Sequence, residues 1–230
     1  MKGAFFMYIT IDATLLEKLP GFSLGMIHYS GMSLSSSPKM LMGRMNYFIE
    51  SLRIEHSLET MKNIPNLSYW RAGFKALGID PSRYRPSSEA LLRRILQGNP
   101  FHWVNSAVDI NNFLSIMHFL PFGLYDVHKL QLPIRCQLGT ENDVYSALNG
   151  RDVTMNGKII LADGNGAFGS PIVDSLRTSV STDSTELLQI IFIPPNVSPN
   201  EQEKIIGSSA RMMIEINGGE VVESAIVSTK

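Results

Sequence analysis

The stretch that decides the fold is Gly98–Leu130, which reads GNPFHWVNSAVDINNFLSIMHFLPFGLYDVHKL. Its first three residues, Gly-Asn-Pro, end one helix, and Pro121 ends the next. Between these breaks apolar residues recur at helical spacing, so one face of this helix is expected to be buried. The residues of that face are Val104, Val108, Phe113, Ile116 and Leu120.

Three polar side chains interrupt the apolar helix at Asp109, Asn111 and Asn112. Asp and Asn are poor residues for a helix interior because their side chains compete for backbone hydrogen bonds. The side chains either tie the helix to a neighbouring loop by local hydrogen bonds or form the polar wall of a pocket. The sequence leaves both interpretations open.

The chain before this stretch begins with strands and continues with helices. Apolar, β-branched and aromatic runs predict the strands, and amphipathic periodicity with stop signals predicts the helices. The strands are expected at 5–11 and 22–30, and the helical segments at 15–19, 37–60, 67–77 and 87–97.

Short β-type runs follow the central helix, separated by Asn-Gly and Gly-Asn-Gly turns that are strong hairpin signals. A late helix opens at Ser198 with Glu201 three residues on, which is a capping box. This arrangement predicts an α+β fold, and the lack of a low-complexity linker favours one domain over residues 1–230. The later strands are expected at 132–137, 144–148, 159–163, 187–193 and 221–227.

The composition is that of a soluble globular protein. Apolar residues make up 44% and charged residues 18% of the 230 residues, which excludes a disordered chain. No apolar run approaches the roughly 18 residues of a membrane span, and Asp12 interrupts the apolar patch near the N-terminus, so no signal peptide is expected. The single cysteine, Cys136, excludes an internal disulfide and is consistent with a cytoplasmic location.

Common signatures of cofactor and metal sites are missing. Gly164–Gly169 has the G-x-G-x-x-G spacing of a dinucleotide site, but Ser170 and Pro171 follow where the site needs a helix. A glycine-rich hairpin in close backbone contact with another group remains open. The histidines lack metal-ligand spacing, and no nucleophile elbow is present. We therefore expect no cofactor and no metal ion.

Charge is distributed unevenly along the chain. Residues 1–103 carry 12 Lys and Arg against 7 Asp and Glu, whereas residues 104–230 carry 8 against 14. Arginines interleaved with aromatic residues suit contact with RNA phosphates and bases, although the solvated faces of ordinary helices give the same pattern. The candidate RNA-binding residues are Arg83, Arg85, Arg93 and Arg94.

Asp174 and Arg177 form the most unusual polar run of the C-terminal half. Because they are three residues apart, they can form an ion pair that fixes a loop. Alternatively, Arg177 presents its planar guanidinium to an anionic ligand such as a nucleotide phosphate. The sequence does not decide between the two.

The central stretch resembles the B3/B4 domain of the phenylalanyl-tRNA synthetase beta subunit, whose pattern is VVDxTNYVxxELGQPLHAFDxDKL. The similarity covers residues 87–195, because the family segments RxAxxGExxxxLDG, LVIAD and VLLExAxFxP have counterparts at 135–150, 159–163 and 187–194. The residues in step with the first pattern are Val108-Asp109, Asn112, Pro121, Tyr125-Asp126 and Lys129-Leu130.

The resemblance implies helices around an unusual β-sandwich, a fold shared with a domain of the lysidine synthetase. It also implies a pocket, because the synthetase domain hydrolyses tRNA mischarged with tyrosine. Gly123 stands where the family has its editing histidine, and Gln189 where it has the glutamate that reads the tyrosine hydroxyl. The expected pocket residues are Asp109, Asn111, Asn112, Gly123, Tyr125, Gly166, Gly169, Asp174, Arg177 and Gln189.

The resemblance implies tRNA or aminoacyl-tRNA as the partner, with no DNA or membrane partner, and leaves the oligomeric state open. The leading hypothesis is a free-standing domain that binds tRNA and acts as a deacylase of mischarged aminoacyl-tRNA. An oriented water and a stabilised oxyanion can drive ester hydrolysis, so the missing histidine weakens this hypothesis without eliminating it. The alternatives are a non-catalytic module that binds an amino acid or a nucleotide, and an RNA-binding adaptor.

Overall fold

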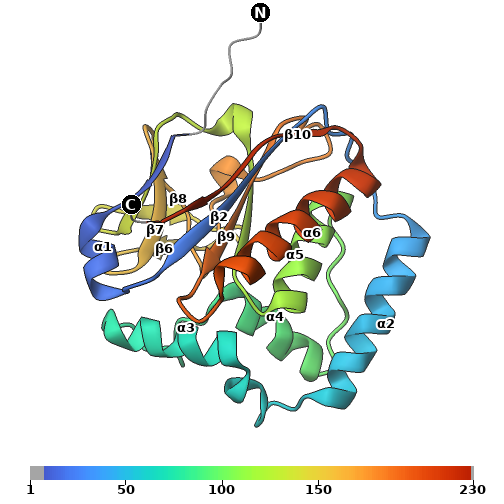
Figure 1. Ribbon diagram of the computed structural model, residues 1–230, viewed down its shortest axis with the longest axis horizontal. Coiled ribbons are helices and arrows are strands. Elements are labelled where there is room, and N and C mark those ends of the chain that lie inside the picture. The colour runs from blue at the N-terminus through green and yellow to red at the C-terminus, as the bar shows by residue number, and fades with distance from the viewer. Residues whose placement is uncertain (1–7, 229–230) are drawn as a thin grey trace, which may run out of the picture.

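The computed structural model describes residues 8–228 and has the expected α+β fold (Figure 1). Each helix predicted from the sequence is present, and Ser198 caps the last one by accepting a hydrogen bond from the Glu201 N–H at 3.3 Å. The helices are α1 Ala13–Lys18, α2 Lys39–Glu55, α3 Pro65–Ala76, α4 Ser87–Leu96, α5 Ser106–His118 and α6 Pro199–Asn217, with short 3-10 turns η1 Met61–Asn63, η2 Val127–Lys129 and η3 Leu176–Thr178.

Two four-stranded sheets form the β part of the described chain. One sheet is antiparallel throughout, in the order β10-β2-β9-β3. The other has the order β1-β4-β7-β8, with β1 and β4 parallel. The strands are β1 Ile9–Ile11, β2 Ser23–Ser30, β3 Phe122–Asp126, β4 Ile134–Leu138, β7 Ile159–Asp163, β8 Gly166–Gly169, β9 Leu187–Ile193 and β10 Glu220–Val227, beside a small hairpin of β5 Val144–Ser146 and β6 Asp152–Thr154.

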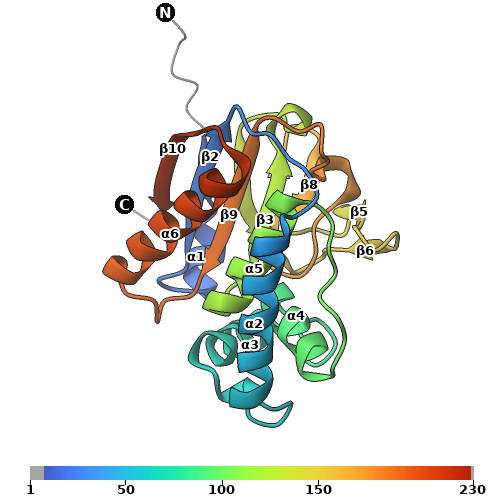
Figure 2. The ribbon, with the colours of Figure 1, turned by 90° about the vertical axis from the view of Figure 1, so that its right-hand side faces the viewer.

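The elements stack in layers. Helices α5 and α6 cover one face of the β10-β2-β9-β3 sheet, and the β1-β4-β7-β8 sheet covers the other face (Figures 1 and 2). Tyr125 of β3 and Phe168 of β8 join the two sheets through an edge-to-face ring contact with centroids 4.9 Å apart. Helix α2 lies outside α5, with Phe48 packed against Phe113. The β10-β2-β9-β3 sheet therefore has two covered faces, so its side chains point into two separate layers.

The structure corrects the sequence interpretation in a few places. Strands β3 and β6 are not predicted by any local pattern, and part of the predicted 5–11 strand lies outside the described residues, so that β1 begins at Ile9. The expectation that Val104 lies on the buried face is wrong, because it precedes α5 and is 53% exposed. The glycine-rich segment forms the β7–β8 hairpin, as the alternative to a dinucleotide site suggested.

Candidate functional site

On the helical side of the β10-β2-β9-β3 sheet, hydrogen bonds join buried polar side chains in a row. The Tyr29 hydroxyl donates to Oε1 of Gln189 at 2.9 Å, and Nε2 of Gln189 donates to Oδ1 of Asn111 at 2.9 Å. Nδ2 of Asn111 in turn donates to the Phe122 carbonyl at 3.3 Å. Burial raises the pKa of Tyr29. These groups already have protein partners, so they fix the helix against the sheet and are not available to a ligand.

On the opposite side of the same sheet, Tyr125 fills a hollow between two glycines. Its ring is fully buried, and its hydroxyl donates to Oδ1 of Asp174 at 2.7 Å. A Cβ atom at Gly123 or at Gly169 would overlap this hydroxyl. The missing side chains therefore make room for a phenol, and the chain's own Tyr125 occupies that room.

Strand register explains why the predicted pocket residues separate into these two layers. Leu124 of β3 lies directly opposite Gln189 of β9, so both side chains point to the same face of the sheet. The neighbours of Leu124 on its strand, Gly123 and Tyr125, point to the other face. Gln189 and Gly123 therefore do not open onto one cavity.

Asp174 is the most perturbed acid of the site. It is half-buried, and its Oδ1 accepts both the Tyr125 hydroxyl and the Ser170 N–H, the latter at 3.3 Å. Burial raises the pKa of this carboxyl to about 7, although the two hydrogen bonds act in the opposite direction. Burial and the neighbouring Asp174 charge also raise the pKa of Tyr125. A carboxyl that titrates near neutral pH can accept a proton from water, as a general base does.

Ser170 and Tyr145 hold the loop that carries Asp174. The Ser170 hydroxyl donates to the Val173 carbonyl at 2.8 Å and accepts the N–H groups of Ile172 and Val173. The Tyr145 hydroxyl also donates to the Val173 carbonyl, at 2.7 Å. This loop is therefore tightly determined, and the position of the Asp174 carboxyl is determined with it.

A cleft of about 400 Å³ opens beside this loop, between the β5–β6 hairpin and the β7–β8 turn. Two of the predicted pocket residues, Gly166 and Arg177, line it. The lining is mostly polar and comprises Asn142, Asp143, Val144, Tyr145, Ser146, Asn165, Gly166, Ala167, Ser175 and Arg177.

Arg177 forms its ion pair with Asp163 and not with Asp174, so the expected ion pair between Asp174 and Arg177 is wrong. Its guanidinium binds both carboxylate oxygens of Asp163, at 2.9 and 3.1 Å, and the carbonyls of Lys129 and Gly166. The Asp163 side chain is fully buried. Arg177 therefore fixes the β7–β8 hairpin against the segment after β3. Both terminal nitrogens of its guanidinium already donate to protein oxygens.

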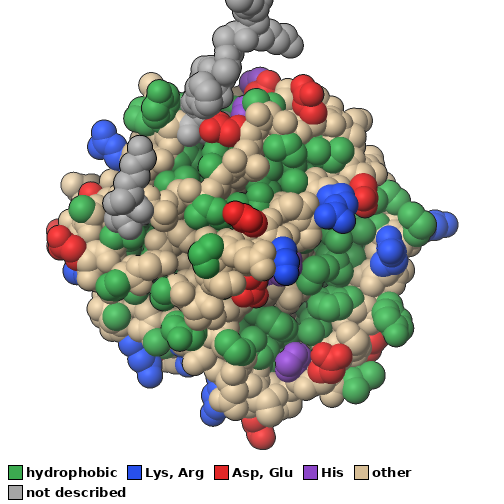
Figure 3. All heavy atoms as spheres, viewed as in Figure 1, with side chains coloured by type: hydrophobic (Ala, Val, Ile, Leu, Met, Phe, Trp, Pro, Cys, Tyr) green, Lys and Arg blue, Asp and Glu red, His purple; other side chains and the backbone are tan. Residues whose placement is uncertain are grey.

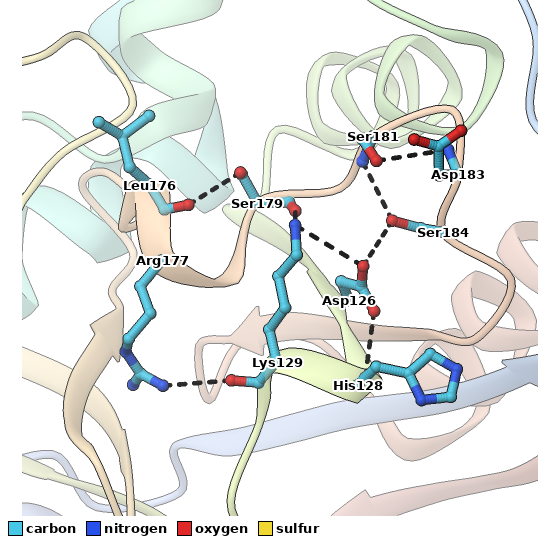
Figure 4. A network of polar contacts seen from close by, with 9 residues as sticks. All are labelled: Asp126, His128, Lys129, Leu176, Arg177, Ser179, Ser181, Asp183 and Ser184. Carbon is cyan, nitrogen blue, oxygen red and sulfur yellow. Dashed lines mark hydrogen bonds and ion pairs between the residues drawn. The ribbon is translucent and has the colours of Figure 1, made fainter.

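The neighbouring loop is tied down by the same kind of contact (Figure 4). The Lys129 ammonium donates to the Ser179 carbonyl at 2.6 Å and lies 3.7 Å from the Asp126 carboxylate. Asp126 also accepts the Ser184 hydroxyl at 2.7 Å. The segment from η3 to β9 is therefore anchored to the end of β3 at several points.

The remaining polar residues of the central helix have different surroundings. Asp109 is buried and accepts the Ser37 hydroxyl at 2.6 Å and the Val104 N–H at 2.8 Å, which is the loop-tying role considered for it. Burial raises the pKa of Asp109. Asn112 is half-buried, and its side chain makes no hydrogen bond to the described residues. Asn111, and not Asn112, therefore connects the helix to Gln189.

The predicted RNA-binding arginines divide into a paired and an unpaired set. Buried Glu89 lies 2.7 Å from Arg71 and 3.9 Å from Arg85, so Arg85 is partly neutralised. Burial raises the pKa of Glu89, and the nearby arginines act against this shift. The three other candidates, Arg83, Arg93 and Arg94, make no ion pair with the described residues; Arg83 and Arg94 are exposed and Arg93 is half-buried. They provide cationic charge along α4 and the loop before it.

Several residues of the site are not identified by sequence reasoning. Tyr29 donates a hydrogen bond to Gln189. The sequence signal that could have identified Tyr29 is its position in a β-type run, because alternate residues of β2 face the helices. Lys158 is buried with its ammonium 4.4 Å from the centroid of the Tyr84 ring, and the Arg83 guanidinium carbon lies 5.2 Å from the same centroid. No local pattern around Lys158 indicates this contact.

The described residues 8–228 contain neither a candidate metal site nor a candidate membrane-spanning helix. No three His, Cys, Asp or Glu side chains gather closely enough to hold a metal ion. No helix in this part of the chain is both long and apolar enough to cross a bilayer.

The chain is similar to known proteins over most of its length. A family model described as the B3/4 domain matches residues 69–216. A Bacillus subtilis (strain 168) protein described as "Uncharacterized protein YhzB" is 27% identical over 213 residues, covering 93% of this chain and 96% of that protein. The phenylalanine–tRNA ligase beta subunit of Fusobacterium nucleatum is 21% identical over 148 residues, covering 54% of this chain but 18% of that subunit.

Among solved structures, an N-terminal fragment of the phenylalanyl-tRNA synthetase beta subunit from Pyrococcus horikoshii is similar, with a TM-score of 0.46 and 11% identity. The match covers 97% of this chain and 55% of that fragment. The chain thus spans nearly all of one relative and a small part of the ligase subunit.

Proposed function

The chain belongs to the B3/4 domain family, and on that premise we propose that it binds tRNA without hydrolysing the aminoacyl ester. The family relation to the beta subunit of a tRNA ligase supports tRNA as the partner. The position of Tyr125 supports the absence of hydrolysis. Under this proposal residues 1–230 act as one domain, and the cytoplasm, where tRNA is charged, is its location.

One observation carries the proposal: the Tyr125 phenol occupies the hollow between Gly123 and Gly169. A second aromatic side chain cannot enter a space that the fully buried Tyr125 ring already fills. The second polar group expected in the pocket, Gln189, is bonded to Tyr29 and Asn111 on the far side of the sheet. Gly123 has no side chain and Gln189 faces the other way, so neither can donate a side-chain hydrogen bond to an oxyanion at the hollow, as ester hydrolysis would need.

The unpaired arginines support a surface for the tRNA backbone. Arg83 and Arg94 are exposed and have no carboxylate partner within ion-pair distance among the described residues. Exposed cationic side chains attract phosphates and release counterions on binding, so the affinity falls steeply with salt. Tyr84, whose ring contacts both Arg83 and Lys158, offers an aromatic ring beside this charge.

Fluorescence anisotropy with a labelled tRNA transcript tests the binding part of the proposal. We expect binding at low salt and a linear fall of log affinity with log salt concentration. A DNA duplex of similar length serves as the comparison, because a general polyanion site would bind both. No binding at low salt, or equal binding of DNA and tRNA, would remove the tRNA proposal.

Hydrolysis of mischarged aminoacyl-tRNA is the second candidate function, and Asp174 favours it. Its carboxyl has a pKa of about 7 and lies on the loop that borders the 400 Å³ cleft. A carboxylate of this kind can activate water near neutral pH. In that case hydrolysis would follow the ionisation of Asp174, and Asp174→Asn would abolish it while tRNA binding stayed unchanged.

A further inference from the structure

Helix α2 has two apolar faces. Its inner face buries Leu41, Met45, Ile49 and Leu52 against the rest of the chain. Its outer face carries Met40, Tyr47 and Ile54, which are 70%, 81% and 87% exposed. These three residues are spaced by seven, so they form a straight stripe along one side of the helix.

The stripe lies on the side of α2 that faces away from the core. At 3.6 residues per turn, the direction of Tyr47 is nearly opposite to that of the buried Met45 and Leu52. The outer side of α2 is open to solvent in the view that looks onto this helix (Figure 2). Single exposed apolar residues are ordinary, but an aligned row of three on one helix indicates an interface.

Apolar surface continues from the stripe into a groove beside α2. The groove has a volume of about 690 Å³ and lies between α2, α5 and α6. Hydrophobic side chains gather between α6 and α2 on this face of the molecule (Figure 3). Tyr47 and Arg44 line its α2 side, and Met117 of α5 and Met212 of α6 line the rest.

The charged residues around the stripe indicate which partner fits it. In an antiparallel pair of α2 helices centred on Tyr47, each residue meets the one equally far from Tyr47 in the partner. Met40 then meets Ile54, and Gly43 meets Ser51, which is a close approach of small residues. The flanking charges become complementary, because Arg44 meets Glu50 and Lys39 meets Glu55. All four of these charged residues are exposed.

We propose that α2 is the interface of a symmetric homodimer, in which Tyr47 packs against its own copy on the two-fold axis. In such an isologous contact, each of the two charge pairs occurs twice. Glu50 pairs with Arg53 within the single chain, but it remains 61% exposed, and an exposed pair of this kind is weak enough to exchange partners.

The interface is small, so the dimer is expected to be weak. A pair of helices with the adjoining groove falls near the lower end of specific interfaces, below about 1,200 Å² of buried surface. Opposite charges at the edge of the contact fix its register and exclude the parallel arrangement, in which Arg44 would not meet Glu50. Association is therefore expected to depend on concentration and to weaken with added salt.

Charge reversal tests the register directly by sedimentation velocity over about a hundredfold range of protein concentration. The wild type is expected to pass from monomer to dimer. Arg44→Glu places a second carboxylate opposite the partner's Glu50, and Glu50→Arg places a second guanidinium opposite the partner's Arg44, so each variant alone is expected to stay monomeric. An equimolar mixture of the two variants is expected to form a heterodimer, and the double variant in one chain a homodimer.

Controls separate a specific contact from general surface effects. Tyr47→Asp is expected to abolish the dimer, whereas Tyr69→Asp, at a 49% exposed tyrosine of α3, is expected to leave it intact. Circular dichroism melts verify that every variant is folded. A wild type that stays monomeric throughout would overturn the proposal. A dimer that ignores both single reversals, or a mixture of the two variants that stays monomeric, would overturn it as well.

Discussion

The hydroxyl of Tyr125 lies 2.7 Å from Oδ1 of Asp174, in a space that Gly123 and Gly169 leave open. The tyrosine comes from the antiparallel sheet and the aspartate from the loop that follows β8 of the other sheet. This hydrogen bond therefore joins the two halves of the sandwich. It also determines what the hollow can accept, because the ring is fully buried.

The first prediction concerns the fit of Tyr125 between the glycines. Gly169→Ala is expected to destabilise the protein by about 1–3 kcal/mol, because the added methyl overlaps a buried, hydrogen-bonded side chain that cannot move aside. Urea unfolding measures the change. Gly207→Ala is the matched control, since a Cβ there meets nothing, and its effect is expected to be close to neutral or stabilising.

A double-mutant cycle sharpens this prediction. Tyr125→Phe removes the hydroxyl that the new methyl would overlap, so the cost of Gly169→Ala is expected to be smaller in the Phe background. Strictly additive effects would show that the Tyr125 hydroxyl does not contribute to the cost of Gly169→Ala, because only the ring carbons would still overlap the new methyl.

The second prediction concerns pH. The folded-state pKa of Asp174 is raised to about 7, so the folded protein holds this proton in a pH range where the unfolded chain has lost it. The contribution of Asp174 to stability therefore falls as pH rises from about 4 to about 7, with a limiting slope near 1.4 kcal/mol per unit. Asp174→Asn removes this dependence, so the variant is expected to gain on the wild type as pH rises.

Unfolding of both proteins at several pH values measures this difference. Comparison with the wild type cancels the contributions of other groups, such as Glu89 and Asp109, whose pKa values are also raised by burial. A stability difference that does not change with pH would contradict the assignment of the raised pKa to Asp174.

The third prediction concerns the hydrogen bonds that join Tyr29, Gln189 and Asn111 on the helical side of the β10-β2-β9-β3 sheet. Gln189→Leu leaves the Tyr29 hydroxyl and the Asn111 carbonyl buried without partners, at a cost of about 1–3 kcal/mol for each group. Urea unfolding measures the loss. Gln97→Leu, at an exposed position at the end of α4, is the control and is expected to stay within about 0.5 kcal/mol. If Gln189→Leu left the free energy of unfolding unchanged, the hydrogen bonds that join Tyr29, Gln189 and Asn111 would contribute nothing to stability.

The fourth prediction concerns the arginine surface. Replacing Arg93 and Arg94 with Ala is expected to weaken tRNA binding and to reduce the slope of log affinity against log salt by about one for each phosphate that is no longer neutralised. Arg211→Ala, at an exposed arginine of α6, is the control and is expected to leave binding unchanged. Equal effects at both places would indicate non-specific attraction and remove α4 from the interface.

Local pattern is enough to predict most of the fold. The helical periodicity, the Asn-Gly turns and the capping residue Ser198 are local signals, and each corresponds to the expected element. Strand β3 escapes prediction because Gly123 and the preceding Pro121 resemble a loop, although every residue of β3 is buried. Its place in the sheet depends on pairing with β9, which no local pattern reveals.

The candidate site is less predictable because its contacts join distant parts of the chain. Asp109 binds Ser37 across 72 positions, and Gln189 binds Asn111 across 78. Asp174 and Arg177 are close in sequence, yet they bind Tyr125 and Asp163 respectively. The alignment of Gly123 and Gln189 with two family positions suggests one pocket, whereas strand register turns position 123 and the Gln189 side chain to opposite faces of the sheet.

The absence of hydrolysis is tested by the release of amino acid from a panel of mischarged tRNAs, measured at about pH 8, where Asp174 is ionised. Since Tyr125 fills the hollow, we expect tRNA binding with release no faster than spontaneous hydrolysis for every member of the panel. Accelerated release of any amino acid by the wild-type protein would contradict it.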